Sequence, residues 1–253
     1  MPADTSAAMQ LVVLAMVIGV VVAVAWVVAP RYLRALRAEL DRSAELEEFA
    51  RERGLAYERL DLTYPSTVAA RFPFELFSRG LDQRCENLLR GTDGRCEVVA
   101  FDFWYSVAAS EETPRTRGGV LTAAAGRAVV GRSCAVATFA ADCPHLAITR
   151  EGTVTRALAD AGVRDIELES ADFNAVFHVA ASDRKFASDF LDPRMMQWLL
   201  DTGRGWDWEI QRGYILCSGP LLRASRVAGM LDALAGVQER IPRAVFALYG
   251  SAA

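Results

Sequence analysis

The chain has 253 residues, 52% of them hydrophobic and 24% charged, which fits one ordinary or two small folded domains plus one membrane segment. Its formal net charge is −4 and its pI is about 5.4. Lys185 is the one lysine among 28 basic residues, and the folded region carries no basic stripe. Binding to phosphate backbones needs such a stripe, so the sequence excludes nucleic acid as an expected partner.

The first predicted element is an uncharged run of 19 residues, from Leu11 to Ala29. A helix rises about 1.5 Å per residue, so this run can cross a hydrocarbon core of about 30 Å. A cleaved signal peptide is the alternative, but it needs a basic N-terminal region and a shorter apolar run. Residues 1–10 hold no Lys or Arg, and Pro30 follows directly. The sequence therefore predicts a transmembrane helix at 11–29, with the lipid bilayer as its partner.

The charges that flank this run predict its orientation. Asp4 is the charged residue on the N-terminal side, whereas Arg31, Arg34 and Arg37 follow the run closely. Because cytoplasmic flanks carry the excess of Lys and Arg, we expect a single-pass protein of the plasma membrane. Residues 1–10 would form a short extracytoplasmic N-terminus, and the C-terminal domain would lie in the cytoplasm.

The cysteines agree with a reducing compartment. They are odd in number and scattered, and no pair has CxxC spacing: Cys85, Cys96, Cys134, Cys143 and Cys217. A secreted disulfide framework is usually dense and even in number. Buried free thiols are the expected state.

Residues 30–54 predict a juxtamembrane helix, because leucines recur at helical spacing at Leu33, Leu36 and Leu40, and Gly54 is a natural stop. A short coiled coil that forms a homodimer is one interpretation of this helix. The other is a spacer that packs on the domain, and it is favoured because fewer than three clean heptads are present.

Residues 55–250 predict one cytoplasmic α+β domain with antiparallel sheet and packed helices. In chain order, the first predicted elements of this domain are a short helix or aromatic plug in RFPFELFSRG (71–80), a hairpin that turns at Asp93-Gly94 and a mobile loop at 108–131. A short helix near 153–161 and a strand at 165–170 follow. The last predicted elements are a hairpin that turns near Arg212-Gly213 and a closing helix before Pro242. The loop at 108–131 is rich in glycine but lacks the Gly-Lys-Ser/Thr ending of a phosphate loop. Two similar halves with a strand–helix–hairpin plan are a further possibility of this order.

Residues 172–200 predict a strand from Phe173 to Ala180, followed by two capped helices. Ser182 or Asp183 would cap the first helix, and Asp192-Pro193 would cap and start the second. The buried face of the second helix would consist of Met196, Leu199 and Leu200.

Three residues are the candidates for chemistry. His178 falls on the polar side of the predicted strand, His145 forms a Cys-x-His pair with Cys143, and Asp102 shares a strand face with Trp104. A surface histidine, a turn residue and a strand residue are the simpler interpretations, because none of the three has a partner at a recognisable spacing. The sequence therefore assigns no catalytic, cofactor-binding or metal-ligating residue, and predicts no cofactor.

Acidic residues cluster on and after the predicted strand at 165–170: Asp165, Glu167, Glu169 and Asp172. A hard cation could bind such a group, but no glycine-bearing calcium loop accompanies them. A solvated strand face is the favoured interpretation.

The chain resembles a group of uncharacterised bacterial proteins with N-terminal transmembrane helices and a cytoplasmic domain of unknown function. The resemblance is strongest at 165–200, in the Glu-Ser pair at 169–170 and in a set of apolar and turn residues: Phe173, Phe177, Val179, Asp183, Ala187, Leu191, Pro193, Met196 and Leu199. The motif RFPFELFSRG is its companion, and the likeness extends over about 70–245. The resemblance implies a fold and carries no catalytic residue.

Three functions compete at this stage. The first is a membrane-anchored domain that acts as a non-catalytic binding or scaffold module for a protein or small molecule. The second is a membrane-tethered, hydrolase-like enzyme with a site around Asp102, His145 or His178. The third is a module for anionic lipid surfaces, which the juxtamembrane arginines would attract.

Overall fold

The computed structural model describes residues 3–61, 64–93, 96–108, 120–123, 127–150 and 162–250. It divides the chain into two compact units, Met1–Glu45 and Leu46–Ala253. The predicted helix near 153–161, most of the predicted loop at 108–131 and the turn residue Gly94 lie outside the described residues.

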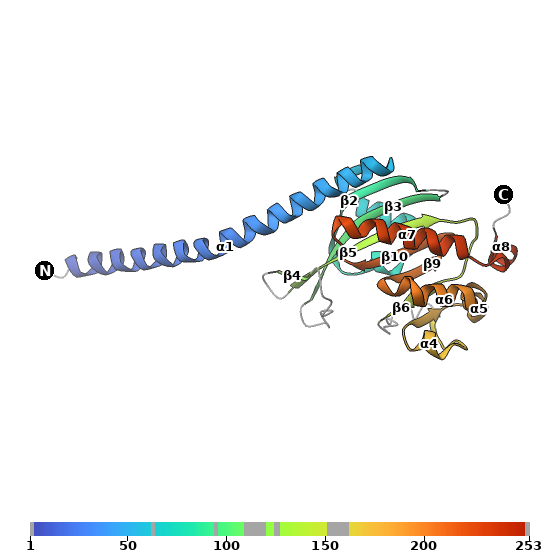
Figure 1. The fold of residues 1–253 in the computed structure, drawn as a ribbon. Helices are drawn as coiled ribbons and strands as arrows, with labels where there is room; N and C mark the ends of the chain where they lie inside the picture. Colours follow the sequence, from blue (N-terminus) through green and yellow to red (C-terminus); the bar gives the residue numbers. More distant parts are fainter. Residues whose placement is uncertain are drawn as a thin grey trace. The chain divides into compact units, whose positions relative to one another are not determined.

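The N-terminal helix α1 runs from Ala3 to Arg53 and so contains both the predicted membrane run and the predicted juxtamembrane helix (Figure 1). It continues through Pro30, whose ring lacks the N–H of a helical residue. The side chain of Arg34 donates a hydrogen bond from Nε to the carbonyl oxygen of Pro30 at 3.1 Å. Among the described residues, the structure contains no helix that is both long enough and apolar enough to cross a bilayer.

The last turns of α1, residues 46–53, belong to the second unit. Leu46 and Ala50 are fully buried, and Leu46 packs against Ala224 and Val227 at the start of helix α7 (Ala224–Arg240). For these turns, packing on the domain is confirmed. Dimerisation through the preceding part of the helix stays a prediction.

The second unit is built on a large antiparallel sheet, which confirms the predicted α+β class. The strand order is β1-β2-β3-β5-β10-β9-β6-β8-β7, and β4 pairs with β5. The strands are β1 Ala56–Asp61, β2 Leu81–Asp93, β3 Cys96–Ala108, β4 Val120–Ala123, β5 Arg127–Thr138, β6 Leu146–Thr149, β7 Arg164–Ile166, β8 His178–Ala181, β9 Asp207–Gln211 and β10 Tyr214–Pro220.

Both predicted hairpins are confirmed. Strands β2 and β3 pair up to Asp93 opposite Cys96, so their connection is at the predicted position. Strands β9 and β10 are joined by Arg212 and Gly213, with φ of 49° and 77°. Two consecutive positive φ angles are typical of the type I′ turn that connects strands through two residues.

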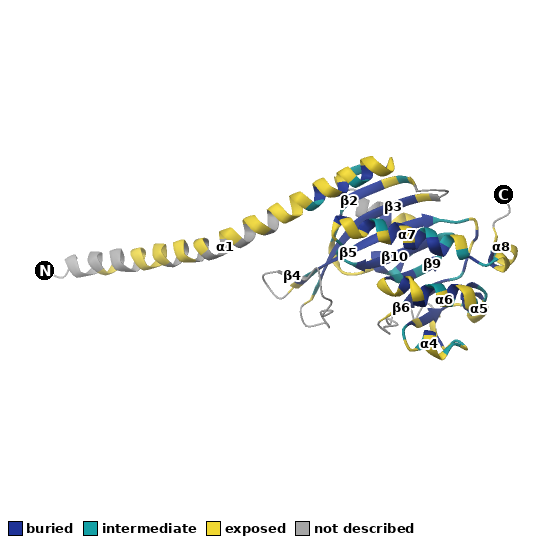
Figure 2. Ribbon diagram, viewed as in Figure 1, coloured by how far each residue is buried: buried dark blue, intermediate teal, exposed yellow. Residues whose placement is uncertain are grey.

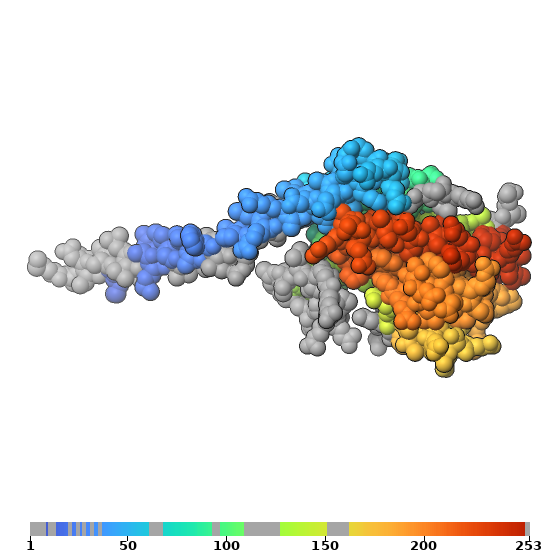
Figure 3. Space-filling model, in the orientation of Figure 1, coloured from blue at the N-terminus to red at the C-terminus, as the bar shows by residue number. Residues whose placement is uncertain are grey.

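The two faces of the sheet are covered by different elements. On one face, α7 lies over β5 and β10, and helix α6 (Pro193–Asp201) packs beside it (Figures 1 and 3). Buried residues, shown dark blue in Figure 2, concentrate on the central strands. The opposite face is covered by the segment with helix α2 (Tyr64–Arg71) and the 3-10 helix η1 (Glu75–Ser78).

The segment over this second face is the predicted aromatic plug: Phe72, Phe74, Leu76 and Phe77. Its side chains are almost fully buried against the alternate residues Val99, Phe101 and Phe103 of β3. The intervening residues of β3, such as Val98 and Ala100, face the helices on the other side of the sheet. The predicted alternation of β3 is thus confirmed, and the plug covers one side of it.

The predicted strand from Phe173 to Ala180 is wrong in its first half. Residues Ala171–Asn174 form the short helix α4, and only His178–Ala181 form β8. Ser170 is the reason, because its side chain accepts a hydrogen bond from the backbone N–H of Phe173 and caps a helical turn. Phe173 and Phe177 therefore stack across one turn, with ring centroids 5.0 Å apart.

Two other boundaries need correction. The predicted strand at 165–170 is only three residues long, Arg164–Ile166. In the predicted loop at 108–131, residues 120–123 form β4 and residues 127–131 are the beginning of β5, opposite β3. The sequence did not predict this pairing, because the segment is rich in small residues and glycines and lacks the alternating β-branched residues that are typical of a strand.

The helix caps predicted within residues 172–200 are confirmed. Asp183 accepts backbone hydrogen bonds from Lys185 and Phe186 and caps helix α5 (Arg184–Phe190). Asp192 accepts one from Met195 at 2.8 Å and caps α6, with Pro193 in the first turn. The buried face of α6 consists of Met195, Leu199 and Leu200, whereas the predicted Met196 is only partly buried.

Asp192→Ala should lower the free energy of unfolding by about 1 kcal/mol, because it removes the acceptor for the backbone N–H of Met195, which has no partner within the first turn of α6. The matched control is Asp201→Ala at the other end of the same helix, where an acidic side chain opposes the helix dipole. We expect this control to leave stability unchanged or slightly raised in urea unfolding. Equal losses in the two variants would contradict the capping role.

Candidate functional site

The three sequence candidates lie in three different environments. Asp102 is a buried residue on the face of β3 that the helices cover, His178 is exposed at the start of β8, and His145 lies directly before β6. The structure does not bring them together. One of them, His145, lines a pocket.

Asp102 is the centre of a buried network of polar side chains. One carboxylate oxygen accepts a hydrogen bond from Asn87 Nδ2 at 2.9 Å, and the other accepts one from Ser133 Oγ at 2.7 Å. The Tyr57 hydroxyl donates to Asn87 Oδ1, and the backbone N–H of Leu222 donates to Ser133 Oγ. The network joins β1, β2, β3 and β5 to the segment before α7, which is a structural role.

Two groups of residues contain potential metal ligands, the Cys143–His145 pair and the acidic cluster at 165–172. Among the described residues, no group of three or more His, Cys, Asp or Glu side chains could hold a metal ion. Burial, with a smaller effect from the neighbouring Asp142 carboxylate, raises the pKa of the Cys143 thiol to about 12. Asp165, Glu167, Glu169 and Asp172 are all exposed, as expected for a solvated surface.

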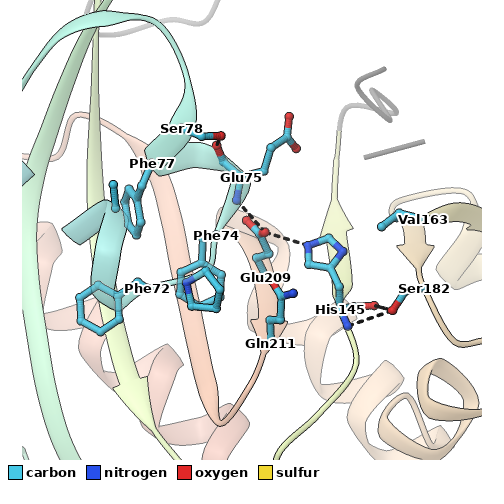
Figure 4. Close-up of a pocket in the computed structure, with 12 residues that line it drawn as sticks. Phe72, Phe74, Glu75, Phe77, Ser78, His145, Val163, Ser182, Glu209 and Gln211 are labelled. Atoms are coloured by element: carbon cyan, nitrogen blue, oxygen red, sulfur yellow. Dashed lines mark hydrogen bonds and ion pairs between the residues drawn. The ribbon is translucent and has the colours of Figure 1, made fainter. Parts of the chain in front are cut away.

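A pocket of about 470 Å³ lies beside the aromatic plug, next to strand β9 (Figure 4). Its apolar wall consists mainly of plug residues, with one residue from the segment before β7: Ala69, Phe72, Pro73, Phe74, Phe77 and Val163. Its polar lining comes from four separate segments of the chain: Glu75, Ser78, His145, Ser182, Glu209 and Gln211. Pockets of this size with one apolar wall and a few polar groups are typical of small-molecule sites.

The polar lining is organised by Glu209. Its Oε1 lies 2.8 Å from His145 Nε2 and also accepts the backbone N–H of Glu75 at 3.0 Å. Figure 4 shows the His145 ring and the Glu209 side chain pointing toward one another, while the Glu75 carboxylate points away. The side chains of His145 and Glu209 are only 6% and 13% exposed, so this is a largely desolvated pair.

The sheet register explains this geometry. Ala147 of β6 lies opposite Glu209 of β9, so His145, two residues earlier on the same face, is a diagonal neighbour of Glu209. His145 is fixed at the strand end by Ser182, which accepts the backbone N–H of His145 and donates its own to the His145 carbonyl. Ser182 therefore positions the backbone of His145 and does not cap α5.

The two ring nitrogens of His145 have different surroundings. An ionised carboxylate only accepts, so Nε2 of His145 carries the hydrogen that Glu209 receives. Nδ1 is buried and has no hydrogen-bond partner among the described residues.

Sequence reasoning named His145 but missed Glu209 and Gln211. Both lie in WDWEIQ, which was correctly assigned to a hairpin strand whose buried residues are Trp208 and Ile210. The alternation places Glu209 on the opposite face, where an acidic residue ordinarily meets solvent. A separation of 64 residues from His145 left no spacing that could reveal the pair.

Comparisons with known proteins add one likeness. No known protein family matches the sequence, and no curated protein matches it. A solved structure, the mycobacterial trehalose monomycolate transport factor A, TtfA, matches with a TM-score of 0.56 and 11% identity. The match covers 79% of this chain and 96% of TtfA. The likeness shows a shared fold.

Proposed function

We propose that the protein is a membrane-anchored binding module whose C-terminal unit holds a small ligand, without chemistry, in the pocket beside the aromatic plug. The pocket carries this proposal, because it combines an apolar wall with a desolvated carboxylate, Glu209, whose Oε1 is already occupied. Its other oxygen, Oε2, is the acceptor that a ligand would meet.

The surroundings of His145 support binding rather than catalysis. A histidine base in a hydrolase needs a nucleophile or water within hydrogen-bond reach of its second nitrogen. Here Nδ1 is buried, and the hydroxyl of Ser182 is bound to the backbone of His145 instead. TtfA, which shares this fold, is named as a transport factor and not as an enzyme.

A variant that fills the pocket tests this proposal. Ala69 lines the pocket and is exposed, and Ala70, its exposed neighbour on α2, does not line it. Benzyl alcohol is a neutral probe whose binding to the full chain in lipid nanodiscs can be measured by calorimetry against empty nanodiscs. We expect Ala69→Trp to abolish the saturable binding that the wild type and the control Ala70→Trp retain. Equal binding by all three proteins would contradict the pocket as the site.

The hydrolase-like alternative has one observation in its favour, the His145–Glu209 pair, since an acidic residue orients the catalytic histidine in many hydrolases. This function predicts that His145→Ala abolishes turnover of a chromogenic ester or amide panel. The binding module predicts no turnover above a protein-free blank in the wild type, in His145→Ala or in the exposed-site variant His178→Ala. Turnover that His145→Ala removes would establish the enzyme.

The anchoring proposal rests on the sequence: Leu11–Ala29 would cross the bilayer and Arg31, Arg34 and Arg37 would remain in the cytoplasm. The native cysteines are poor reporters of this topology, because four of them are buried: Cys85, Cys134, Cys143 and Cys217. An engineered thiol at an exposed position is needed instead.

Asp165, which is exposed, offers that position in a Cys96→Ser background. We expect a membrane-impermeant maleimide to label Asp165→Cys only after the cells are permeabilised. Labelling on intact cells would place the domain outside. Recovery of the chain in the soluble fraction after carbonate extraction would contradict anchoring altogether.

A further inference from the structure

We propose that the ligand of this pocket carries a protonated amine that pairs with Glu209, attached to an apolar body that packs on the aromatic plug. This inference rests on the proposed function, since it names the class of molecule that the same pocket takes. It follows from the carboxylate of Glu209, from its oxygen Oε2, which accepts no hydrogen bond from the described residues, and from the walls of the pocket.

The first observation is a carboxylate without a lysine or arginine beside it among the described residues. The groups that donate hydrogen bonds to Glu209 are the backbone N–H of Glu75 and the ring of His145. Among the described residues, His145 is also the one basic side chain within ion-pair distance of Glu209. A carboxylate that is 13% exposed is expensive to bury without a counter-charge. A ligand cation would supply it.

The neighbouring carboxylate of Glu75 shows the contrast. Arg79 donates a hydrogen bond from Nη2 to its Oε1 at 3.2 Å, so this acidic side chain already has a cationic partner within the protein. Among the described residues, Glu209 is therefore the pocket carboxylate without a lysine or arginine partner.

The remaining lining selects against anions. Among the described residues that line the pocket there is no lysine or arginine. A carboxylate or phosphate ligand would lie close to Glu209 and Glu75 without compensation, which repulsion and desolvation both oppose. Gln211, two residues from Glu209 on the same face of β9, adds a neutral amide that can orient a polar group.

The opposite wall requires an apolar body. Phe72, Pro73 and Phe74 come from the plug, whose rings are held by the core beneath them. A volume of about 470 Å³ exceeds what an ammonium ion alone would fill. The site thus fits a molecule with an amine at one end and a hydrocarbon or aromatic group at the other.

Three probes of nearly identical shape test the class: benzylamine, which is protonated at neutral pH, benzyl alcohol and benzoate. Calorimetry on the full chain in nanodiscs should rank benzylamine first, benzyl alcohol about tenfold weaker, and benzoate without measurable binding, because only the first compensates the buried charge. A matching or better affinity for benzyl alcohol or benzoate would overturn the amine.

Glu209→Gln keeps the shape of the side chain and removes its charge. We expect this variant to bind benzylamine about tenfold more weakly than the wild type does, and therefore with the same affinity as benzyl alcohol. The matched control is Glu58→Gln, on the exposed edge strand β1, which should keep the wild-type ranking. If Glu209→Gln fails to fold, the ranking of the three probes on the wild type still decides the matter.

The outcomes separate the two proposals. Benzyl alcohol binding that Ala69→Trp abolishes, without a preference for benzylamine, would retain the binding pocket and refute the amine. Absence of binding by all three probes would refute both. The source of the amine is tested by measuring the affinity for benzylamine in nanodiscs of phosphatidylethanolamine and in nanodiscs of phosphatidylcholine. A weaker affinity in phosphatidylethanolamine alone indicates that the lipid headgroup competes for the pocket. Equal affinities in the two lipids indicate that the natural ligand is a free amine.

Discussion

Replacing Phe77 by alanine should lower the free energy of unfolding by about 3–5 kcal/mol, the range for a large aromatic residue removed from a packed core. Phe77 is 1% exposed, and its ring lies 5.2 Å from Phe103 and 5.6 Å from Phe101 between centroids. The substitution would leave a cavity between the plug and β3. Urea unfolding followed by tryptophan fluorescence measures the loss.

Two further variants control this result. Phe246→Ala removes the same ring from an exposed position on helix α8 (Arg243–Tyr249) and should change stability by less than about 1 kcal/mol. Phe77→Leu keeps much of the volume and should lose less than half as much as Phe77→Ala. A similar loss in Phe77→Ala and Phe246→Ala would show that the plug is not part of the core.

The Phe77 variants also affect the pocket, because Phe77 belongs to its apolar wall. The same rings thus complete the core on one side and shape the ligand site on the other. This arrangement explains why RFPFELFSRG is so rich in phenylalanine: its side chains form the apolar layer that covers this face of the sheet.

The parts of the fold that could be predicted are those in which local patterns and tertiary packing agree. The alternation of β3, the turn at Arg212-Gly213 and the cap at Asp192 each follow from a few adjacent residues. The segment around Phe173 could not be predicted in this way, because its alternation favours a strand while the side chain of Ser170 stabilises a helical turn. The hydrogen bond to the cap decides the outcome.

The site was harder to predict than the fold for a physical reason. His145 and Glu209 meet only because β6 inserts between β8 and β9, an order that no local pattern contains. Residue type did not reveal the site either, because Glu209 alternates with the buried residues Trp208 and Ile210 as an ordinary solvent-facing residue does. The aromatic plug, which is distant in sequence, shields Glu209 from solvent.

Asp102→Ala should lower the free energy of unfolding by about 2–4 kcal/mol, because two buried donors, on Asn87 and Ser133, would lose their acceptor at about 1–3 kcal/mol each. The removal of a buried carboxylate offsets part of this loss. Chemical unfolding of the full chain measures it. Asp165→Ala, on the solvated surface, is the control that should leave stability unchanged.

Asp102→Asn decides between a structural and a chemical role. Its amide oxygen can still accept from Asn87, and its amide nitrogen can donate to Ser133 Oγ, so about half or more of the lost stability should return. If Asp102 acted instead as a catalytic acid or base, the asparagine variant would fold like the wild type and lose all activity that His145 supports. Because Asp102 and His145 lie on opposite faces of the sheet, we expect benzylamine binding in Asp102→Asn to match the wild type. A selective loss of binding in this stable variant would connect the buried network to the pocket, contrary to the structural role.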